Sequence, residues 1–379
     1  SANLGVLLNK DDFAQVALDG TRYNFMTFGW GDEVQPRIGV VYNTEALKGD
    51  KAYANYGRYY GLEQKSTSRS FAPFRIRQDQ AFFNRMTGVF LREQIRGSSA
   101  GKFIPSDLKA PYTDEFVVGY AAPLTGVLSF DTNFQYRQTK DIFEDVPVDP
   151  NNYFGSFQAK NLPDARRRYR AISIAVTKRL QNHWAADVSY TYSKLDGNFD
   201  LDYSGVDVFN TSSILEDAPG INTVEPNRQG TLSQDRPHIL KIFGSYELPF
   251  GVVFGGYFRL QSGAAWEARG QDGNGSFYRY LEPAGSRRLP TQANVDLLAA
   301  YNFHLGGPVN LRMEARVLNV FDTQTPLTVN KTQYLDPYVD GNPPSTLGPQ
   351  GTKQPNPNFG NYLSFAQPRR LVLTALIDF

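Results

Sequence analysis

The sequence predicts an all-β protein, a transmembrane antiparallel β-barrel with about eleven or twelve strands in this chain. Apolar and polar residues alternate with a period of two in a series of segments, most of them about 10–12 residues long. The connections between these segments are alternately short and long. No run of 18 apolar residues forms a membrane-spanning helix, whereas a spanning strand needs only about 9–11 residues with every second one apolar.

The composition excludes several classes of function. Lys and Arg total 39 against 38 for Asp and Glu, and a net charge of +1 lacks the basic excess of a nucleic-acid-binding protein. The absence of Cys excludes disulfides and Cys-ligated metals, and 3 His leave little room for His-based catalysis. We therefore predict no catalytic residue, and the protein is not expected to be an enzyme.

The alternation defines the strands in order along the chain, after at most one strand within residues 1–30. The segment 51–61 is aromatic and alternates less regularly. The apolar faces of the other segments are Ile38, Val40 and Tyr42 in 36–43; Phe116, Val118 and Tyr120 in 114–121; Leu128, Phe130, Phe134 and Tyr136 in 126–138; Ile172, Ile174 and Val176 in 169–180; Trp184, Ala186, Val188, Tyr190 and Tyr192 in 183–194; Leu240, Ile242, Tyr246 and Leu248 in 238–248; Phe254, Phe258 and Leu260 in 252–262; and Val295, Leu297, Ala299, Tyr301 and Phe303 in 293–304.

The last two segments show the pattern most clearly. In 309–318, Arg312, Glu314 and Arg316 share one side while only apolar residues lie opposite, which a strand allows and a helix does not. The final segment, 370–379, ends in an aromatic residue. Its apolar face consists of Leu371, Leu373, Ala375, Ile377 and Phe379.

The polar faces are expected to line a water-filled lumen. They form either a wall that contacts a transported solute or a hydrated interior whose ions pair across strands. Rings near the strand ends, such as those of Trp184 and Tyr192, fit the aromatic girdles at the membrane surfaces. The predicted lumen-facing residues are Asp131, Arg137, Lys241, Glu247, Arg259, Asp296, Arg312, Glu314 and Arg316.

The lengths of the connections favour a barrel over a soluble antiparallel sheet with one wet face. In an outer-membrane barrel, tight turns face the periplasm and long loops face outward, and hydrocarbon tolerates no open sheet edge. The short connections are 44–50, 122–125, 181–182, 249–251 and 304–308, and the long ones are 62–113, 139–168, 195–237, 263–292 and 319–369.

Two charge clusters lie at the predicted outer ends of strands. Guanidinium groups bind phosphate in two-pronged fashion, so the phosphates of lipopolysaccharide are a candidate ligand of Arg166, Arg167, Arg168 and Arg170, with a solvated rim as the alternative. The second cluster consists of Asp196, Asn198, Asp200, Asp202 and Asp207. Its spacing does not match an EF-hand loop, so no cofactor is predicted, and calcium in loop 196–207 is kept only as an alternative.

Several short motifs resemble one known family. The end of the chain, Leu371 to Phe379, is similar to the C-terminal assembly signal of bacterial outer-membrane proteins. The stretch Ala315 to Asp322 resembles the N-x-F-D ending of the penultimate strand in TonB-dependent receptors. Segments similar to the Oar-like branch, whose members carry an N-terminal carboxypeptidase-regulatory-like domain, are Gln35 to Tyr42, Tyr112 to Phe116, Asp235 to Leu240 and Gly256 to Gly263.

The resemblance implies a receptor in the bacterial outer membrane. Members of the family have a 22-stranded barrel, an N-terminal plug and a short box that binds TonB. Residues 1–379 are therefore expected to be the C-terminal portion of such a barrel, with the plug and the TonB box not present in it. The partners implied are outer-membrane lipid and lipopolysaccharide, the TonB complex acting through the plug, the barrel assembly machinery and a small solute of unknown class; no nucleic acid is implied.

The functional expectation that follows is energised uptake, with the outer loops binding the solute. Two alternatives remain open from the sequence. One is a complete smaller barrel of about 12 strands that serves as a passive pore or translocator. The other is a structural anchor in an outer-membrane surface assembly that no longer transports.

Overall fold

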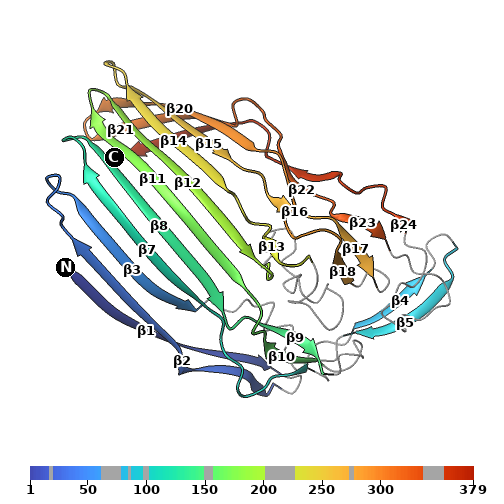
Figure 1. The fold of residues 1–379 in the computed structure, drawn as a ribbon. Coiled ribbons are helices and arrows are strands. Elements are labelled where there is room, and N and C mark those ends of the chain that lie inside the picture. Colours follow the sequence, from blue (N-terminus) through green and yellow to red (C-terminus); the bar gives the residue numbers. More distant parts are fainter. Residues whose placement is uncertain are drawn as a thin grey trace.

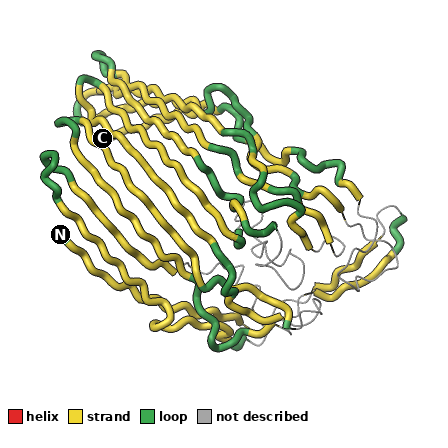
Figure 2. The backbone as a smooth tube through the Cα atoms, viewed as in Figure 1, coloured by secondary structure: helices red, strands yellow, loops and turns green. Residues whose placement is uncertain are grey.

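The computed structural model describes residues 1–16, 20–60, 78–83, 87–96, 102–148, 157–200, 227–272, 277–335 and 354–379. Its regular structure consists of β-strands (Figures 1 and 2). No helix in these ranges is long and apolar enough to cross a membrane.

One antiparallel sheet dominates the molecule (Figure 1). Every strand in its main path pairs with its neighbours in the path, which follow chain order. The short strand β13 (Gly230–Thr231) also pairs with the end of β12. The path runs through β1 (Ala2–Val16), β2 (Arg22–Tyr42), β3 (Lys51–Tyr60), β7 (Tyr112–Pro123), β8 (Leu128–Lys140), β11 (Arg167–Gln181), β12 (Trp184–Gly197), β14 (His238–Glu247), β15 (Val252–Gln261), β20 (Gln292–Gly306), β21 (Val309–Leu318) and β26 (Arg370–Asp378).

Each segment predicted from alternation forms a strand of this sheet. The N-terminal region differs, because β1 and β2 form a ribbon in which β2 has 21 residues. The prediction of a short strand at 36–43 is therefore wrong at its start. Alternation fails over Gly29 to Asp32, where the register between the two strands shifts and the Gly29 N–H donates to the Asp32 carboxylate at 2.7 Å.

The sheet is a curved shell that does not close on itself (Figures 1 and 2). Within the described ranges, β1 pairs only with β2, and β26 pairs only with β21. A complete barrel of about twelve strands, one of the two alternatives left open by the sequence, would pair β1 with β26. The observed sheet order disagrees with this alternative.

The long connections fold into small sheets beyond the far ends of the strands (Figure 1). These are β6 (Lys102–Phe103) with β10 (Phe157–Asn161) and β9 (Phe143–Pro147); β16 (Ala265–Trp266) with β19 (Arg287–Arg288); β18 (Phe277–Tyr280) with β17 (Arg269–Asp272), β23 (Thr332–Leu335) and β24 (Gln354–Pro355); β22 (Pro326–Val329) with β25 (Tyr362–Phe365); and β4 (Gln78–Phe83) with β5 (Phe90–Arg96). Parts of the predicted loops, including 61–77, 201–226 and 336–353, lie outside the described residues.

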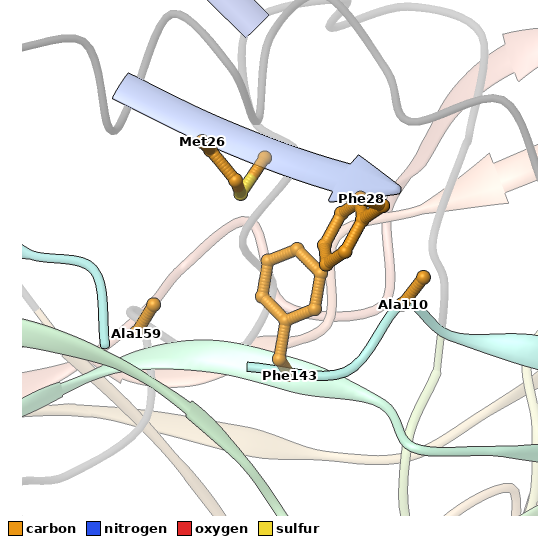
Figure 3. Close-up of a cluster of buried hydrophobic side chains, with 5 residues drawn as sticks. All are labelled: Met26, Phe28, Ala110, Phe143 and Ala159. Atoms are coloured by element: carbon orange, nitrogen blue, oxygen red, sulfur yellow. The ribbon is translucent and has the colours of Figure 1, made fainter. Parts of the chain in front are cut away.

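A small hydrophobic core joins the outer half of β2 to one of these sheets (Figure 3). Met26 and Phe28 from β2 lie against Phe143 of β9, Ala159 of β10 and Ala110, which precedes β7. Phe28 and Ala159 are each only 1% exposed. The extension of β2 therefore holds the loop sheet in place beside the strand ends, since burial of these rings stabilises the contact.

Candidate functional site: the polar face of the sheet and its outer rim

The strand register places every predicted lumen-facing residue on one face of the sheet. Asp131 lies opposite Ala175, Ala175 opposite Ser189, and Ser189 opposite Lys241. Lys241 in turn lies opposite Arg259. Because side chains two residues apart share a face, the same register extends to Arg137, Glu247, Asp296, Arg312, Glu314 and Arg316.

The opposite face is apolar and exposed. Leu373 and Ile377 in β26 are 70% and 59% exposed, and Met313 in β21 is 44% exposed. The neighbouring carboxylate of Glu314, on the polar face, is 7% exposed. A soluble sheet buries its apolar face, so this arrangement fits a sheet whose apolar side contacts hydrocarbon.

On the polar face, several ions pair along or across the strands. Glu314 accepts hydrogen bonds from Arg312 Nε at 2.8 Å and from Arg316 Nη2 at 2.5 Å. Arg137 pairs with Glu115 of the adjacent strand β7. These pairs satisfy charges that would be costly if left alone in a partly desolvated lumen.

Asp131 is held by a tyrosine from two strands away. The Tyr53 hydroxyl in β3 lies 3.0 Å from both carboxylate oxygens of Asp131 in β8. The intervening strand contributes Gly119, where a Cβ would lie 2.3 Å from the Tyr53 ring. Because Gly119 has no side chain, the Tyr53 ring can cross β7 and reach Asp131.

Two cations lie side by side in the middle of the polar face. Lys241 and Arg259 are directly opposed in register, and neither forms an ion pair with another described residue. Arg236, which precedes β14, has its pKa lowered by burial and by the nearby charges of Arg288 and Arg259. Like charges opposite each other are destabilising, so this position is suited to an anionic group supplied from elsewhere.

A cavity of about 340 Å³ opens beside Arg259. Asp296 lies in its wall and accepts hydrogen bonds from the Asn294 amide and the Asn319 N–H, both at 2.8 Å. Its lining includes Tyr257, Arg259, Gln261, Gln292, Asn294, Asp296, Asn319 and Arg370. It therefore offers hydrogen-bond donors and acceptors from three strands to a small polar molecule.

An ionic network with a buried centre joins the outer connections. Arg269 donates from Nε to Glu267 at 2.6 Å and from Nη2 to the Tyr280 hydroxyl at 3.1 Å, while Arg228 lies over the Tyr280 ring. Burial raises the pKa of Glu267, but the charges of Arg269 and Lys331 outweigh it and bring the pKa below its ordinary value. Burial raises the pKa of Tyr280. The network ties the connections around 228, 267–282 and 331 into one unit.

Asp235 links the sheet to these connections. It is 2% exposed and accepts hydrogen bonds from the Leu195 N–H at 2.6 Å and from Arg288 Nη2 at 2.7 Å. Arg288 also donates to the carbonyl oxygen of Gly263, where a Cβ would lie 1.9 Å from the Leu289 oxygen. Asp235 and Gly263 both belong to motifs noted in the sequence, and their roles explain why those residue types occur there.

The arginine run at the start of β11 is divided between the two faces. Arg168 and Arg170 lie on the apolar face and bind Asp196, whereas Arg167 points to the polar side and donates to Gln234 at 2.7 Å. The Arg166 N–H donates to Asn198. Because alternate residues of a strand point in opposite directions, the four arginines cannot form one contact surface.

The acidic cluster considered for calcium is already engaged where the structure describes it. The Asp196 carboxylate contacts two arginines, and Asp200 accepts a hydrogen bond from the Ser233 N–H at 2.7 Å. Asp202 and Asp207 lie outside the described residues. Among the residues that are described, no group of acidic and histidine side chains has a metal-binding arrangement.

Several residues of the rim were not recognised from the sequence as candidates. Arg228, Glu267, Arg269 and Tyr280 occur in connections without periodicity, so no pattern indicated their burial or their mutual contacts. The one local signal in this region is the Asp235-Arg-Pro sequence, which resembles a segment of the Oar-like branch.

The described fold, with one exposed apolar face and one ion-paired polar face, is that of a β-barrel portion of an outer-membrane protein. Residues 9–320 match the family model described as "TonB dependent receptor-like, beta-barrel". The chain belongs to this family, which places it in the outer membrane.

Individual relatives agree. The chain is 25% identical to the TonB-dependent transporter Oar of Myxococcus xanthus over 90% of its own length and 38% of that protein. The crystal structure of the outer membrane transporter YddB from Escherichia coli superposes with a TM-score of 0.57 at 14% identity, covering 94% of this chain and 42% of YddB. The crystal structure of the ferric enterobactin receptor of Pseudomonas aeruginosa superposes with a TM-score of 0.51 at 12% identity, covering 91% of this chain and 40% of that receptor. The chain thus spans about two fifths of the length of the relatives it matches.

Proposed function

We propose that residues 1–379 form the C-terminal barrel portion of a TonB-dependent transporter that takes up a small solute across the outer membrane. The observation that carries the proposal is the polar face, which presents ionic and hydrogen-bonding side chains from many strands on a sheet whose other face is apolar and exposed. A membrane anchor without transport needs the apolar face but has no use for such a wall.

The rest of the transporter lies outside this chain in our proposal. The open edges at β1 and β26 are the places where further strands would complete the barrel, because hydrocarbon leaves unpaired backbone groups unsatisfied. A plug with a TonB-binding box would fill the lumen and transmit energy from the inner membrane. The share of the Oar transporter that the chain covers, 38%, supports this division.

The solute would enter past the outer connections. The network of Arg228, Glu267, Arg269 and Tyr280 fixes three of them relative to one another, which preorganises a binding surface. Below it, Lys241 and Arg259 are adjacent cations without an ion pair among the described residues, and an anionic solute or an acidic side chain of the plug would bind there.

The test uses cells that express the full-length protein. Depletion of small molecules from growth medium is followed by mass spectrometry in wild-type cells, in cells without the protein, and in cells lacking TonB. The proposal predicts a compound that disappears only when both the protein and TonB are present. Equal depletion without TonB would leave a passive pore as the explanation.

The role of the wall is tested with matched variants. Lys241→Gln removes a charge that has no partner among the described residues, so uptake should slow while the amount of protein in the membrane stays the same. Thr177→Val, on the same face, removes a hydroxyl that only contacts Asp187, and serves as the control. Unchanged uptake in Lys241→Gln would exclude the residue from the path of the solute.

The intact mass tests the division of the chain. A protein isolated from the outer membrane that is much heavier than 42.5 kDa, or that holds a second chain, agrees with the proposal. A closed barrel of 42.5 kDa alone contradicts it.

A further inference from the structure

A row of charged and polar side chains crosses the apolar face of the sheet near its outer edge. Arg58 of β3 lies opposite Asp114 of β7, which lies opposite Gln138 of β8. Gln138 lies opposite Arg168 of β11, and Arg168 opposite Asp196 of β12. The register thus aligns these side chains across five adjacent strands.

The row belongs to the face that contacts hydrocarbon. Moving two residues at a time toward the short turns keeps to one face and leads first to a mixed row and then to apolar side chains. The mixed row contains Tyr56, Phe116, Tyr136, Arg170 and Lys194, and the apolar row contains Ala54, Val118, Phe134, Ile172 and Tyr192. Charges thus replace apolar groups toward the outer ends of the strands, which is the change expected where hydrocarbon gives way to lipid headgroups.

Each carboxylate of the row is shared by two cations. The Asp114 carboxylate forms ion pairs with Arg58 Nε at 2.9 Å and with Lys140 Nζ at 3.5 Å. The Asp196 carboxylate forms an ion pair with Arg168 Nη2 at 2.9 Å and a second one with Arg170. Since both carboxylates are buried beneath these cations, the surface that faces outward is positive.

The exposures support this geometry. The side chains of Asp114 and Asp196 are 9% and 8% exposed, whereas those of Lys140 and Arg170 are 44% and 46% exposed. Lys194, opposite Arg170, is exposed and adds a further charge. The carboxylates orient the guanidinium groups of Arg58, Arg168 and Arg170 through these bonds.

We propose that this row, with Lys140, Arg170 and Lys194, binds the phosphate groups of a lipid of the outer leaflet. A phosphate carries the charge that the cations lack and accepts two parallel hydrogen bonds from one guanidinium. The acyl chains of the same lipid would lie along the exposed apolar side chains of the rows below, such as Phe134 and Ile172. The site is separate from the solute path, because it lies on the opposite face of the sheet.

The experiment measures lipid bound to the full-length protein purified in a mild detergent. The probe is lipopolysaccharide with its lipid A phosphates intact, added in increasing amounts and counted by native mass spectrometry. A second arm uses the dephosphorylated lipid, and a third adds millimolar inorganic phosphate as competitor.

The variant R168Q/R170Q/D196N removes both cations together with their carboxylate, so no buried charge is left without a partner. Its affinity for the phosphorylated lipid should fall about tenfold or more. The control R166Q/R167Q changes two arginines of the same run that do not belong to the row, and it should bind like the wild type. Lys194→Gln, a change at an exposed position, should weaken binding severalfold. It provides a second test in case the triple variant does not fold.

Three results would overturn the proposal. They are equal binding by the wild type, the triple variant and Lys194→Gln; equal binding of the dephosphorylated lipid; and complete displacement of the lipid by inorganic phosphate, which would make the row a site for the free anion.

Discussion

The hydroxyl of Tyr53 reaches the carboxylate of Asp131 at 3.0 Å although a complete strand separates the two residues. The contact exists because Gly119 leaves the space between them open. Three strands of the polar face are thereby connected by side chains as well as by backbone hydrogen bonds.

Replacing Gly119 by Val should destabilise the barrel. The new side chain occupies the place of the Tyr53 ring, so the hydrogen bond to a charged acceptor is lost, at about 1–3 kcal/mol. The urea midpoint of the full-length protein in lipid vesicles measures the effect. Gly5→Val, at a strand glycine with no atom within 4 Å of the added Cβ, is the control, and equal midpoints for the two variants would contradict the account.

Asp235→Asn should loosen the outer connections. The substitution keeps an acceptor for the Leu195 N–H but removes the ion pair with Arg288, and about 1–3 kcal/mol is expected because Arg288 is partly exposed. Protease cleavage of the outer loops on intact cells should become faster. Asp107→Asn, in an exposed loop, should leave the cleavage rate unchanged. Equal cleavage rates for the two variants would contradict the role of Asp235 in holding the outer connections to the sheet.

The short turn before β3 should depend on pH through Asp50. Hydrogen bonds from the Thr44 and Tyr120 hydroxyls and the Leu47 N–H lower the pKa of Asp50 to about 2 from its ordinary 3.8. A lowered pKa stabilises the fold above about pH 4, and the contribution is lost as pH falls from 4 toward 2. Thermal unfolding of wild type and Asp50→Asn should therefore converge in this range; a constant difference between them would disprove the assignment.

The last strand should govern assembly into the membrane. We propose that Leu371, Leu373, Ala375, Ile377 and Phe379, which share the exposed apolar face, are recognised by the barrel assembly machinery. Phe379→Ser should lower the amount of folded protein in the outer membrane severalfold. Asp378→Asn changes the neighbouring residue, on the polar face, and should leave the amount of folded protein unchanged. An equal loss in both variants would show that recognition does not depend on the apolar face.

The strands of the main sheet could be predicted from the sequence because hydrocarbon and water impose opposite requirements on adjacent residues. Leu311 and Arg312 illustrate this, and both lie on the predicted faces. The outer half of β2 could not be predicted, since Met26 and Phe28 pack on a loop sheet formed by residues far away in the chain.

The rim shows the same limit. The burial of Arg228 and Arg269 depends on contacts among three separate connections, which no local pattern encodes. The division of Arg167 from Arg168 between the two faces arises because β11 begins at Arg167, two residues before the predicted segment 169–180, and alternation places strand ends only within a few residues.

The central claim is that lipid contacts one face of each strand and water the other, and adjacent positions in β26 test it most directly. Because the chain contains no Cys, Thr374→Cys and Ala375→Cys can each carry a single spin label. In lipid vesicles containing the full-length protein, oxygen should relax the label at 375 more strongly, and a water-soluble nickel complex the label at 374. The reverse order, or equal access of both reagents at both positions, would contradict the assignment of the two faces.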